Sequence, residues 1–226
     1  MNYSLILLCA GSGKRTGLKY NKIFYKINNQ TVYEMNISHF LEDNRCKQII
    51  VVTKENEIDD IRTLVNDSRI EYVFGGKERQ DSVYEGLQKV KENHVFIHDG
   101  ARPMISAELI QKCIYYVKKY RACVVGMPSK DTVKIVDEND FAVNTPERRF
   151  VWCIQTPQVF ETALIRHAYF KLMENEENET GITDDAMVVE RMENCAVKLV
   201  EGSYENIKIT TPEDLILAES LIKKRN

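Results

Sequence analysis

The first fifteen residues constrain this chain most, because a strand-length apolar run leads directly into glycines and cations. Residues 4–10 form the run, and Gly11, Gly13, Lys14 and Arg15 follow it. A continuous apolar run is typical of a buried parallel strand. Glycines let the backbone approach phosphate oxygens, and the two cations can neutralise a triphosphate. The pattern therefore predicts a nucleotide-phosphate loop, although it matches neither the P-loop nor the dinucleotide fingerprint. A tight, charged strand-to-loop connection is the alternative.

Length and composition indicate one α/β domain. A chain of 226 residues can bury one large core but is too short for two ordinary domains, so residues 1–226 are expected to form a single domain. The net charge of −3 argues against a protein that coats nucleic acid, and no apolar stretch is long enough to span a membrane. The N-terminal apolar run is also too short, and lacks the charged flank, for a signal peptide.

The cysteines point to a reducing compartment. The six are Cys9, Cys46, Cys113, Cys123, Cys153 and Cys195. They are scattered without a C-x-x-C pair, and several lie in apolar runs. We expect buried free thiols in a cytoplasmic protein.

Strand-like and helix-like segments alternate along most of the chain. Strands are predicted at 4–10, 22–27, 48–53, 70–74, 94–98, 122–127 and 197–200. Helices are predicted at 31–41, 57–65, 80–91, 107–120 and 161–173, after a capping Thr183, and from Pro212 onwards. A polar stretch at 174–179 is expected to be a solvated loop. Such alternation predicts a mostly parallel sheet with helices on both faces and a ligand at the carboxyl ends of the strands.

Unusual residues gather at two of those strand ends. Gly75, Gly76 and Ser82 follow the strand at 70–74, and this pattern suits a loop that recognises a flat base. A glycine turn in which Asp81 or Ser82 caps the next helix is an equally good interpretation.

The strand at 94–98 runs into Asp99, which is followed by a glycine. A carboxylate at a strand end near a phosphate loop has the hard oxygen that Mg²⁺ requires. An ion pair with Arg102 within the turn is the alternative role for Asp99. Lys208, near the C-terminus, has no evident structural role in its segment.

Residues 129–152 break the alternation. Two short strand-like runs separated by a polar turn predict a β-hairpin, which has nothing of its own to pack against. We expect it to project as an arm and to meet another subunit. Trp152, at its end, is expected to be a core or interface anchor.

These motifs together resemble one family, the 2-C-methyl-D-erythritol 4-phosphate cytidylyltransferases of the non-mevalonate isoprenoid pathway. The resemblance covers nearly the whole chain, in the order Ala-Gly-x-Gly-x-Arg, Gly-Gly-x-Glu-Arg-x-x-Ser-Val, His-Asp-x-Ala-Arg-Pro, Asp-Thr-Val-Lys, Gln-Thr-Pro-Gln, Thr-Asp-Asp-Ala and Glu-Gly-Ser-x-x-Asn-Ile-Lys. It implies a Rossmann-like nucleotidyltransferase sheet and a homodimer in which the β-arm completes the neighbour's active site.

The resemblance also assigns expected roles to residues. It places Ala10, Gly11, Gly13, Arg15, Lys22, Gly76, Ser82 and Asp99 around CTP, with Asp99 as the Mg²⁺ ligand, and Thr132, Arg148, Thr183, Lys208 and Thr210 around the sugar phosphate. Arg15, Lys22 and Lys208 are the expected catalytic groups. The attacking phosphate is already ionised, so the reaction needs positioning and charge stabilisation rather than a catalytic base.

Some positions depart from the family pattern. Cys9 and Thr16 change packing size in the first loop, and Asn21 precedes the expected lysine where proline is common. Lys77 occupies a position that is often acidic, which weakens any side-chain role there.

Two other functions remain open at this point. Transfer to ribitol 5-phosphate for cell-wall polymers is one, because that sister family shares the nucleotide half. The segment Asp131–Lys134 and Arg148 resemble the isoprenoid branch more closely. A catalytically inactive nucleotide-binding module is the other, and the cations together with Asp99 argue against it.

Overall fold

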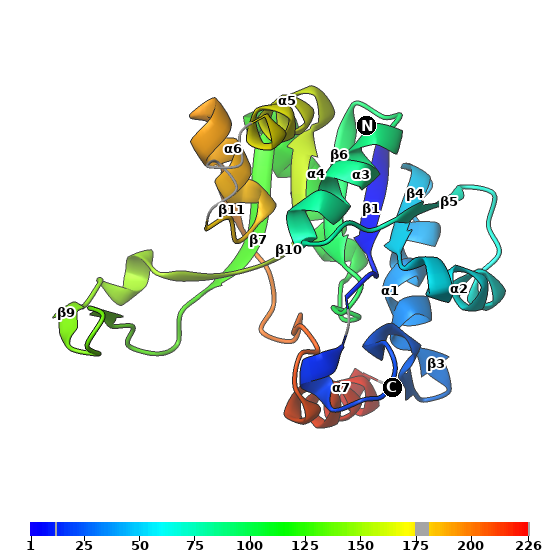
Figure 1. Ribbon diagram of the computed structural model, residues 1–226, viewed down its shortest axis with the longest axis horizontal. Helices are drawn as coiled ribbons and strands as arrows, with labels where there is room; N and C mark the ends of the chain where they lie inside the picture. Colours follow the sequence, from blue (N-terminus) through cyan, green and yellow to red (C-terminus); the bar gives the residue numbers. More distant parts are fainter. Residues whose placement is uncertain (12, 175–180, 226) are drawn as a thin grey trace.

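A computed structural model describes residues 1–11, 13–174 and 181–225, and its centre is a seven-stranded sheet (Figure 1). The strand order is β11 (Lys198–Glu201), β7 (Ala122–Pro128), β10 (Trp152–Glu161), β6 (His94–Asp99), β1 (Tyr3–Leu8), β4 (Cys46–Thr53) and β5 (Ile70–Phe74). Every neighbouring pair is parallel except the two pairs that β10 makes. The predicted α/β class and mostly parallel sheet are confirmed.

Helices cover both faces, as predicted. On one side lie α1 (Val32–Leu41), α2 (Ile58–Leu64) and α4 (Ala107–Tyr120), and on the other α3 (Arg79–Lys89), α5 (Thr162–Met173) and α6 (Asp185–Glu193). Strand β1 serves both layers, because Leu5 and Leu7 pack with the first set and Ile6 with the second. All three side chains are fully buried. A strand buried on both faces reads as a continuous apolar run, which is why its position could be predicted.

Helix α7 (Pro212–Arg225) lies apart from these layers. Its Leu215 and Ala218 pack with Ile27 and Val32 in a smaller cluster. Figure 1 shows it beside the blue turn that follows β1. Helix α7 thus supports the first loop of the chain.

Strand β10 was not predicted. It runs antiparallel between β6 and β7, and sequence reasoning gave residues 155–158 no element. Proline in a central strand normally argues against a strand, because it cannot donate to the ladder. Here the pairing register shifts between Ile154 and Gln158, so Pro157 falls where the ladder is irregular.

Other differences are local. The predicted strand at 22–27 is instead a short 3₁₀ turn (Lys22–Phe24) followed by β2 (Lys26–Ile27). The turn forms because the Asn21 side chain accepts from the Ile23 N–H. Strand β2 pairs with β3 (Gln30–Thr31). Helix α6 is capped by Asp184, whose carboxylate accepts from the Met187 N–H, and not by Thr183. Residues 175–179 of the predicted polar loop lie outside the described residues.

The cysteine prediction was partly wrong. All six thiols are free, and Cys9, Cys46, Cys113 and Cys123 are buried. Cys195 is only half-buried, and Cys153 is exposed because it lies at the start of β10, next to the arm. In the described part of the chain, no helix has the length and apolar character to cross a bilayer.

The predicted hairpin exists and projects from the body of the molecule (Figure 1). It consists of β8 (Ile135–Val136) and β9 (Ala142–Asn144), which pair antiparallel. Large apolar side chains on it are open to solvent, with Phe141 71% and Phe150 72% exposed. Trp152 is half-buried at the base of this arm. We call residues 129–152 the arm from here on.

Helix α3 packs on β1 through Gly86, and we predict that this glycine cannot be enlarged without cost. An added Cβ would lie 2.9 Å from Ile6 Cγ2. Alanine improves helix propensity by up to about 1 kcal/mol, but overpacking of a core costs about 1–3 kcal/mol. Gly86→Ala should therefore lower the free energy of unfolding by about 1 kcal/mol in urea titrations. Gln88→Ala, on the exposed side of the same helix, is the control and should change it little.

Candidate active site

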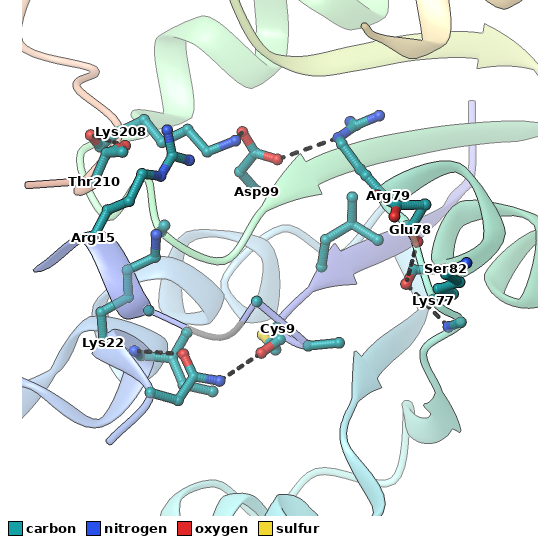
Figure 2. Close-up of a pocket in the computed structure, with 18 residues that line it drawn as sticks. Cys9, Arg15, Lys22, Lys77, Glu78, Arg79, Ser82, Asp99, Lys208 and Thr210 are labelled. Atoms are coloured by element: carbon teal, nitrogen blue, oxygen red, sulfur yellow. Dashed lines mark hydrogen bonds and ion pairs between the residues drawn. The ribbon is translucent and has the colours of Figure 1, made fainter. Parts of the chain in front are cut away.

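A cleft of about 410 Å³ opens at the carboxyl ends of β1, β5 and β6 (Figure 2). It brings together ten of the residues predicted from the sequence: Ala10, Gly11, Gly13, Arg15, Lys22, Gly76, Ser82, Asp99, Lys208 and Thr210. They come from four separate parts of the chain. The convergence follows from the parallel sheet, whose loops meet at one edge.

The first loop is held in shape by its own residues. Gly13 has φ +66°, a conformation that side chains rarely adopt, and an added Cβ would lie 3.3 Å from the Tyr20 carbonyl oxygen. The Thr16 hydroxyl donates to the Gly13 carbonyl at 2.6 Å. The Asn21 side chain donates to the Cys9 carbonyl at 2.7 Å. Asn21, noted above only as a departure from the family, thus ties the loop to the end of β1.

Three cations face the cleft from this loop and from the C-terminal segment. Figure 2 shows Arg15, Lys22 and Lys208 converging on one side of the cleft. Burial lowers the pKa of Lys22, and the positive charges of Lys208 and Arg15 lower it further. Cations that repel one another at close range are a poor arrangement for stability alone, but they suit a polyanionic ligand.

Asp99 lies among cations. Its Oδ2 is 2.9 Å from Lys208 Nζ and 3.3 Å from Arg102 Nε, and its Oδ1 is 3.8 Å from Arg79 Nε. Burial by itself raises the pKa of this carboxyl, but the charges of Arg79, Lys208 and Arg102 bring it well below its usual range. The turn ion pair with Arg102 is therefore present. Lys208 was expected to have no structural role, and this was wrong, because it pairs with Asp99.

The loop after β5 is closed by tight packing. A Cβ on Gly76 would lie 2.2 Å from Asp81 Cβ, and one on Gly75 would lie 2.7 Å from Ala10 Cβ. The Ser82 hydroxyl accepts from the Gly76 N–H and donates to the Glu78 carbonyl, both at 3.1 Å. Asp81 completes a capping box with Glu78, so the capping interpretation holds for Asp81, whereas Ser82 fixes the turn that faces the cleft.

Arg79 lines the cleft and was missed. Its Nη1 and Nη2 donate to the two oxygens of Asp185 at 2.9 and 2.7 Å. Burial lowers the pKa of this guanidinium, yet the negative charge of Asp185 raises it above its ordinary value. Both residues stand in motifs quoted above, Gly-Gly-x-Glu-Arg and Thr-Asp-Asp-Ala, but they lie 106 positions apart in the sequence. Sequence spacing gave no signal that they meet.

Three of the residues predicted for the site lie outside this cleft. Thr132 and Arg148 are exposed on the arm, where Arg148 Nη1 donates to the Lys130 carbonyl at 3.3 Å. Thr183 is exposed ahead of α6, and its hydroxyl lies 3.8 Å from Met187 Sδ. None of the three lines the cleft of its own subunit. Their roles remain predictions.

Within residues 1–11, 13–174 and 181–225, acidic, histidine and cysteine side chains do not gather in a group of three or more that could hold a metal ion. Two carboxylates line the cleft, those of Asp99 and Glu78, which are too few for a metal site made by the protein alone. Such a site could bind a divalent ion only together with ligands from a substrate.

Comparison with known proteins points to one family. The family model for 2-C-methyl-D-erythritol 4-phosphate cytidylyltransferase matches residues 3–224. The protein of that name from Lachnospira eligens is 43% identical over 223 residues, covering 96% of this chain and 98% of the relative. The one from Caldanaerobacter subterraneus is 44% identical over 231 residues, covering 99% and 100%.

Solved structures give the same result. The 4-diphosphocytidyl-2C-methyl-D-erythritol synthase of Anaerococcus prevotii superposes with a TM-score of 0.87 at 35% identity, covering 98% of each chain. The Francisella tularensis 2-C-methyl-D-erythritol 4-phosphate cytidylyltransferase has a TM-score of 0.82 at 30% identity, covering 97% of this chain and 99% of the other. These matches, over nearly the whole chain, establish that the chain belongs to the 2-C-methyl-D-erythritol 4-phosphate cytidylyltransferase family.

Proposed function

We propose that this chain transfers the CMP group of CTP to 2-C-methyl-D-erythritol 4-phosphate. An oxygen of the sugar phosphate forms a bond to the α-phosphorus of CTP, and the bond from that phosphorus to the β-phosphate oxygen breaks. The products are 4-diphosphocytidyl-2-C-methyl-D-erythritol and pyrophosphate. The observation that carries the proposal is the convergence of Arg15, Lys22 and Lys208 on one cleft. The family match supplies the identity of the substrates.

The cations can perform most of the chemistry. The attacking phosphate is ionised at neutral pH, so no group needs to remove a proton from it. Two polyanions must instead be held in line while charge builds on the α-phosphate. Lys22 and Lys208, which come from opposite ends of the sequence, can stabilise that charge, and Arg15 can hold the triphosphate with two donors. Lys208 would exchange Asp99 for phosphate oxygens when the substrates bind.

A divalent cation such as Mg²⁺ fits the residues present. Asp99 Oδ2 takes the two short contacts from Lys208 and Arg102, whereas Oδ1 faces Arg79 at 3.8 Å, longer than a hydrogen bond. Among the described residues, Oδ1 of this hard carboxylate thus accepts no hydrogen bond, which leaves it available to a cation. Mg²⁺ is commonly held by one or two carboxylates and substrate phosphates. When bound, it would neutralise the triphosphate and favour departure of pyrophosphate.

The remaining cleft residues suit the nucleotide and the acceptor. Ala10, Gly11 and Gly13 would lie along the ribose and phosphates, and the turn that carries Gly76 and Ser82 would face the cytosine. Because the Ser82 hydroxyl already makes two hydrogen bonds within that turn, we propose that backbone groups form the hydrogen bonds to the cytosine. Thr210 and, ahead of α6, Thr183 would contact the acceptor.

The arm supports a homodimer in which each subunit completes the other's site. Phe141, Val143 and Phe150 are 71%, 61% and 72% exposed, an unusual concentration of apolar surface on a thin projection. A second copy of the arm related by two-fold symmetry would bury them. Thr132 and Arg148, which lie outside the cleft of their own subunit, would then reach the partner's sugar-phosphate site.

The ribitol 5-phosphate alternative is not favoured, because the family model and the relatives carry the methylerythritol name. We predict that pyrophosphate release from CTP will proceed with 2-C-methyl-D-erythritol 4-phosphate and that kcat/KM for ribitol 5-phosphate will be more than about tenfold lower. The measurement is a coupled pyrophosphate assay with each acceptor. Equal efficiency with both, or release with neither, would contradict the proposal.

We further predict that Lys22 and Lys208 act chiefly on the transition state. Lysine is a point charge that can follow charge as it develops on the α-phosphate. Alanine at either position should lower kcat by about 100-fold or more while raising KM for CTP much less. Lys19→Ala is the matched control, because Lys19 is exposed on the same loop and does not line the cleft. A raised KM with kcat preserved would assign both lysines to ground-state binding.

The arm can be tested by mixing two inactive variants. Lys22→Ala damages the core of a site, and Arg148→Ala damages the arm. If the arm acts in trans, each heterodimer has one site with an intact core and an intact borrowed arm, and one site with both defects. Equal mixing makes about half the dimers heterodimers, so about a quarter of wild-type activity should return.

The same mixing experiment has a clear opposite result. If Arg148 serves its own subunit, every site in the heterodimer retains one defect and no activity returns. Subunit exchange is verified separately by differential tagging and pull-down. Exchange without recovery of activity would show that the arm does not act in trans.

A further inference from the structure

A buried network of hydrogen bonds, completed by one ion-pair contact, runs from the outer helical layer to Asp99. Asp185 is the first residue of α6, and its side chain is fully buried. Its two oxygens accept from Arg79 Nη1 and Nη2, and Oδ1 also accepts from the Tyr169 hydroxyl at 2.6 Å. The third nitrogen of the guanidinium, Nε, lies 3.8 Å from Asp99 Oδ1. Figure 2 shows Arg79 and Asp99 joined by this contact across the cleft.

Stability alone is a weak reason for such a network. Removing an arginine and an aspartate from water costs several kcal/mol, and buried ion pairs are often no more stabilising than apolar residues of equal volume. Arg79 also lines the cleft instead of lying in the interior of the helical layer. The arrangement of its nitrogens therefore calls for an explanation at Asp99.

Asp185 occupies both terminal nitrogens of the Arg79 guanidinium, Nη1 and Nη2. Only Nε is therefore left to face Asp99. If Nη1 or Nη2 were free, the guanidinium could form a bidentate pair with Asp99 and occupy both carboxylate oxygens. Held by Asp185, it presents only Nε at a distance beyond hydrogen-bond length. The positive charge still attracts Oδ1, while the lone pairs of Oδ1 stay open.

A positive charge on the Oδ1 side of Asp99 can fix the orientation of this carboxylate. Lys208 and Arg102 both contact Oδ2. Rotation about the last side-chain bond of aspartate is soft, so without a charge on the other side Oδ1 could also turn toward these two cations. The Arg79 charge opposes that rotation. We propose that Arg79, aligned by Asp185, is a positioning residue that keeps Asp99 Oδ1 turned away from Lys208 and Arg102 and available to a divalent cation.

The test compares metal binding with catalysis, and it rests on the proposed function only through the role of Asp99. Mn²⁺ binding to the enzyme in the presence of CTP, without acceptor, is measured by electron paramagnetic resonance. Arg79→Lys keeps the positive charge but removes the paired Nη1 and Nη2 donors. Asp185→Asn removes the carboxylate that holds these two donors. Each should weaken Mn²⁺ binding and lower kcat by about 10- to 100-fold, the usual effect of losing a partner of a metal ligand, with KM for CTP changed by less than about threefold.

A matched control is available at the opposite end of the sheet. Arg69 forms a similar pair with Asp67, through Nε at 2.9 Å and Nη2 at 2.9 Å, just before β5. Arg69→Lys should lower Tm but leave Mn²⁺ binding and kcat unchanged. If Arg79→Lys and Asp185→Asn likewise lower only Tm, Arg79 has a structural role and the proposal is wrong.

A milder variant covers the case in which these two changes prevent folding. Tyr169→Phe removes one hydrogen bond from Asp185 and should weaken Mn²⁺ binding in the same direction by a smaller factor. Unchanged Mn²⁺ binding in a folded Tyr169→Phe enzyme that has also kept its kcat would overturn the proposal. Mn²⁺ binding is measured without the acceptor, so it does not depend on which sugar phosphate the enzyme uses. An error in the proposed acceptor would appear only in the pyrophosphate assay with the two acceptors.

Discussion

Burial of β1 on both faces is the constraint on which the remaining structure depends. Leu5 and Leu7 face one helical layer and Ile6 faces the other, and none of the three is exposed. A strand in that position must have helices on both sides, and its parallel neighbours must return through crossovers. Polar and charged loop residues are thereby driven to the strand ends. The cleft is a consequence of this topology as much as of the residues that line it.

Positive charges outnumber negative ones among the residues that line the cleft at those strand ends. Two carboxylates line the cleft, Asp99 and Glu78. The cations that line it are more numerous, even with Arg79 paired to Asp185: Arg15, Lys22, Lys77, Arg79 and Lys208. Burial lowers the pKa of Lys22, and the positive charges of Lys208 and Arg15 lower it further, which outweighs the opposite effect of nearby Asp99. A triphosphate and a sugar phosphate would supply the missing negative charge. The site thus stores repulsion that substrate binding relieves.

The sequence was most informative where local pattern and tertiary environment agree. Strand β5 and helix α4 have the predicted bounds, because an apolar strand between turns and a capped amphipathic helix are each specified within a few residues. Strand β10 was missed because Pro157 contradicts the local rule and a register shift accommodates it. The cleft residues of the first loop, the β5 turn and Asp99 were identified because glycines, cations and a carboxylate stand at strand ends.

What sequence pattern could not supply is the pairing of distant charges. Arg79 and Asp185 meet only because α3 and α6 pack on the same face of the sheet. The same is true of Lys208, which was predicted to act on phosphates but not to pair with Asp99.

The two oxygens of Asp99 belong to different parts of the fold. Oδ2 is contacted from its own turn by Arg102 and from the C-terminal segment by Lys208, whereas Oδ1 faces Arg79 from the layer of α3 and α6. Lysine has a flexible stem and is the partner that can leave when phosphate arrives. Arg79 is clamped by a fully buried carboxylate and cannot follow. Oδ2 can therefore exchange Lys208 for another partner while Arg79, on the Oδ1 side, holds the orientation of the carboxylate. The layer of α3 and α6 thus takes part in building the site.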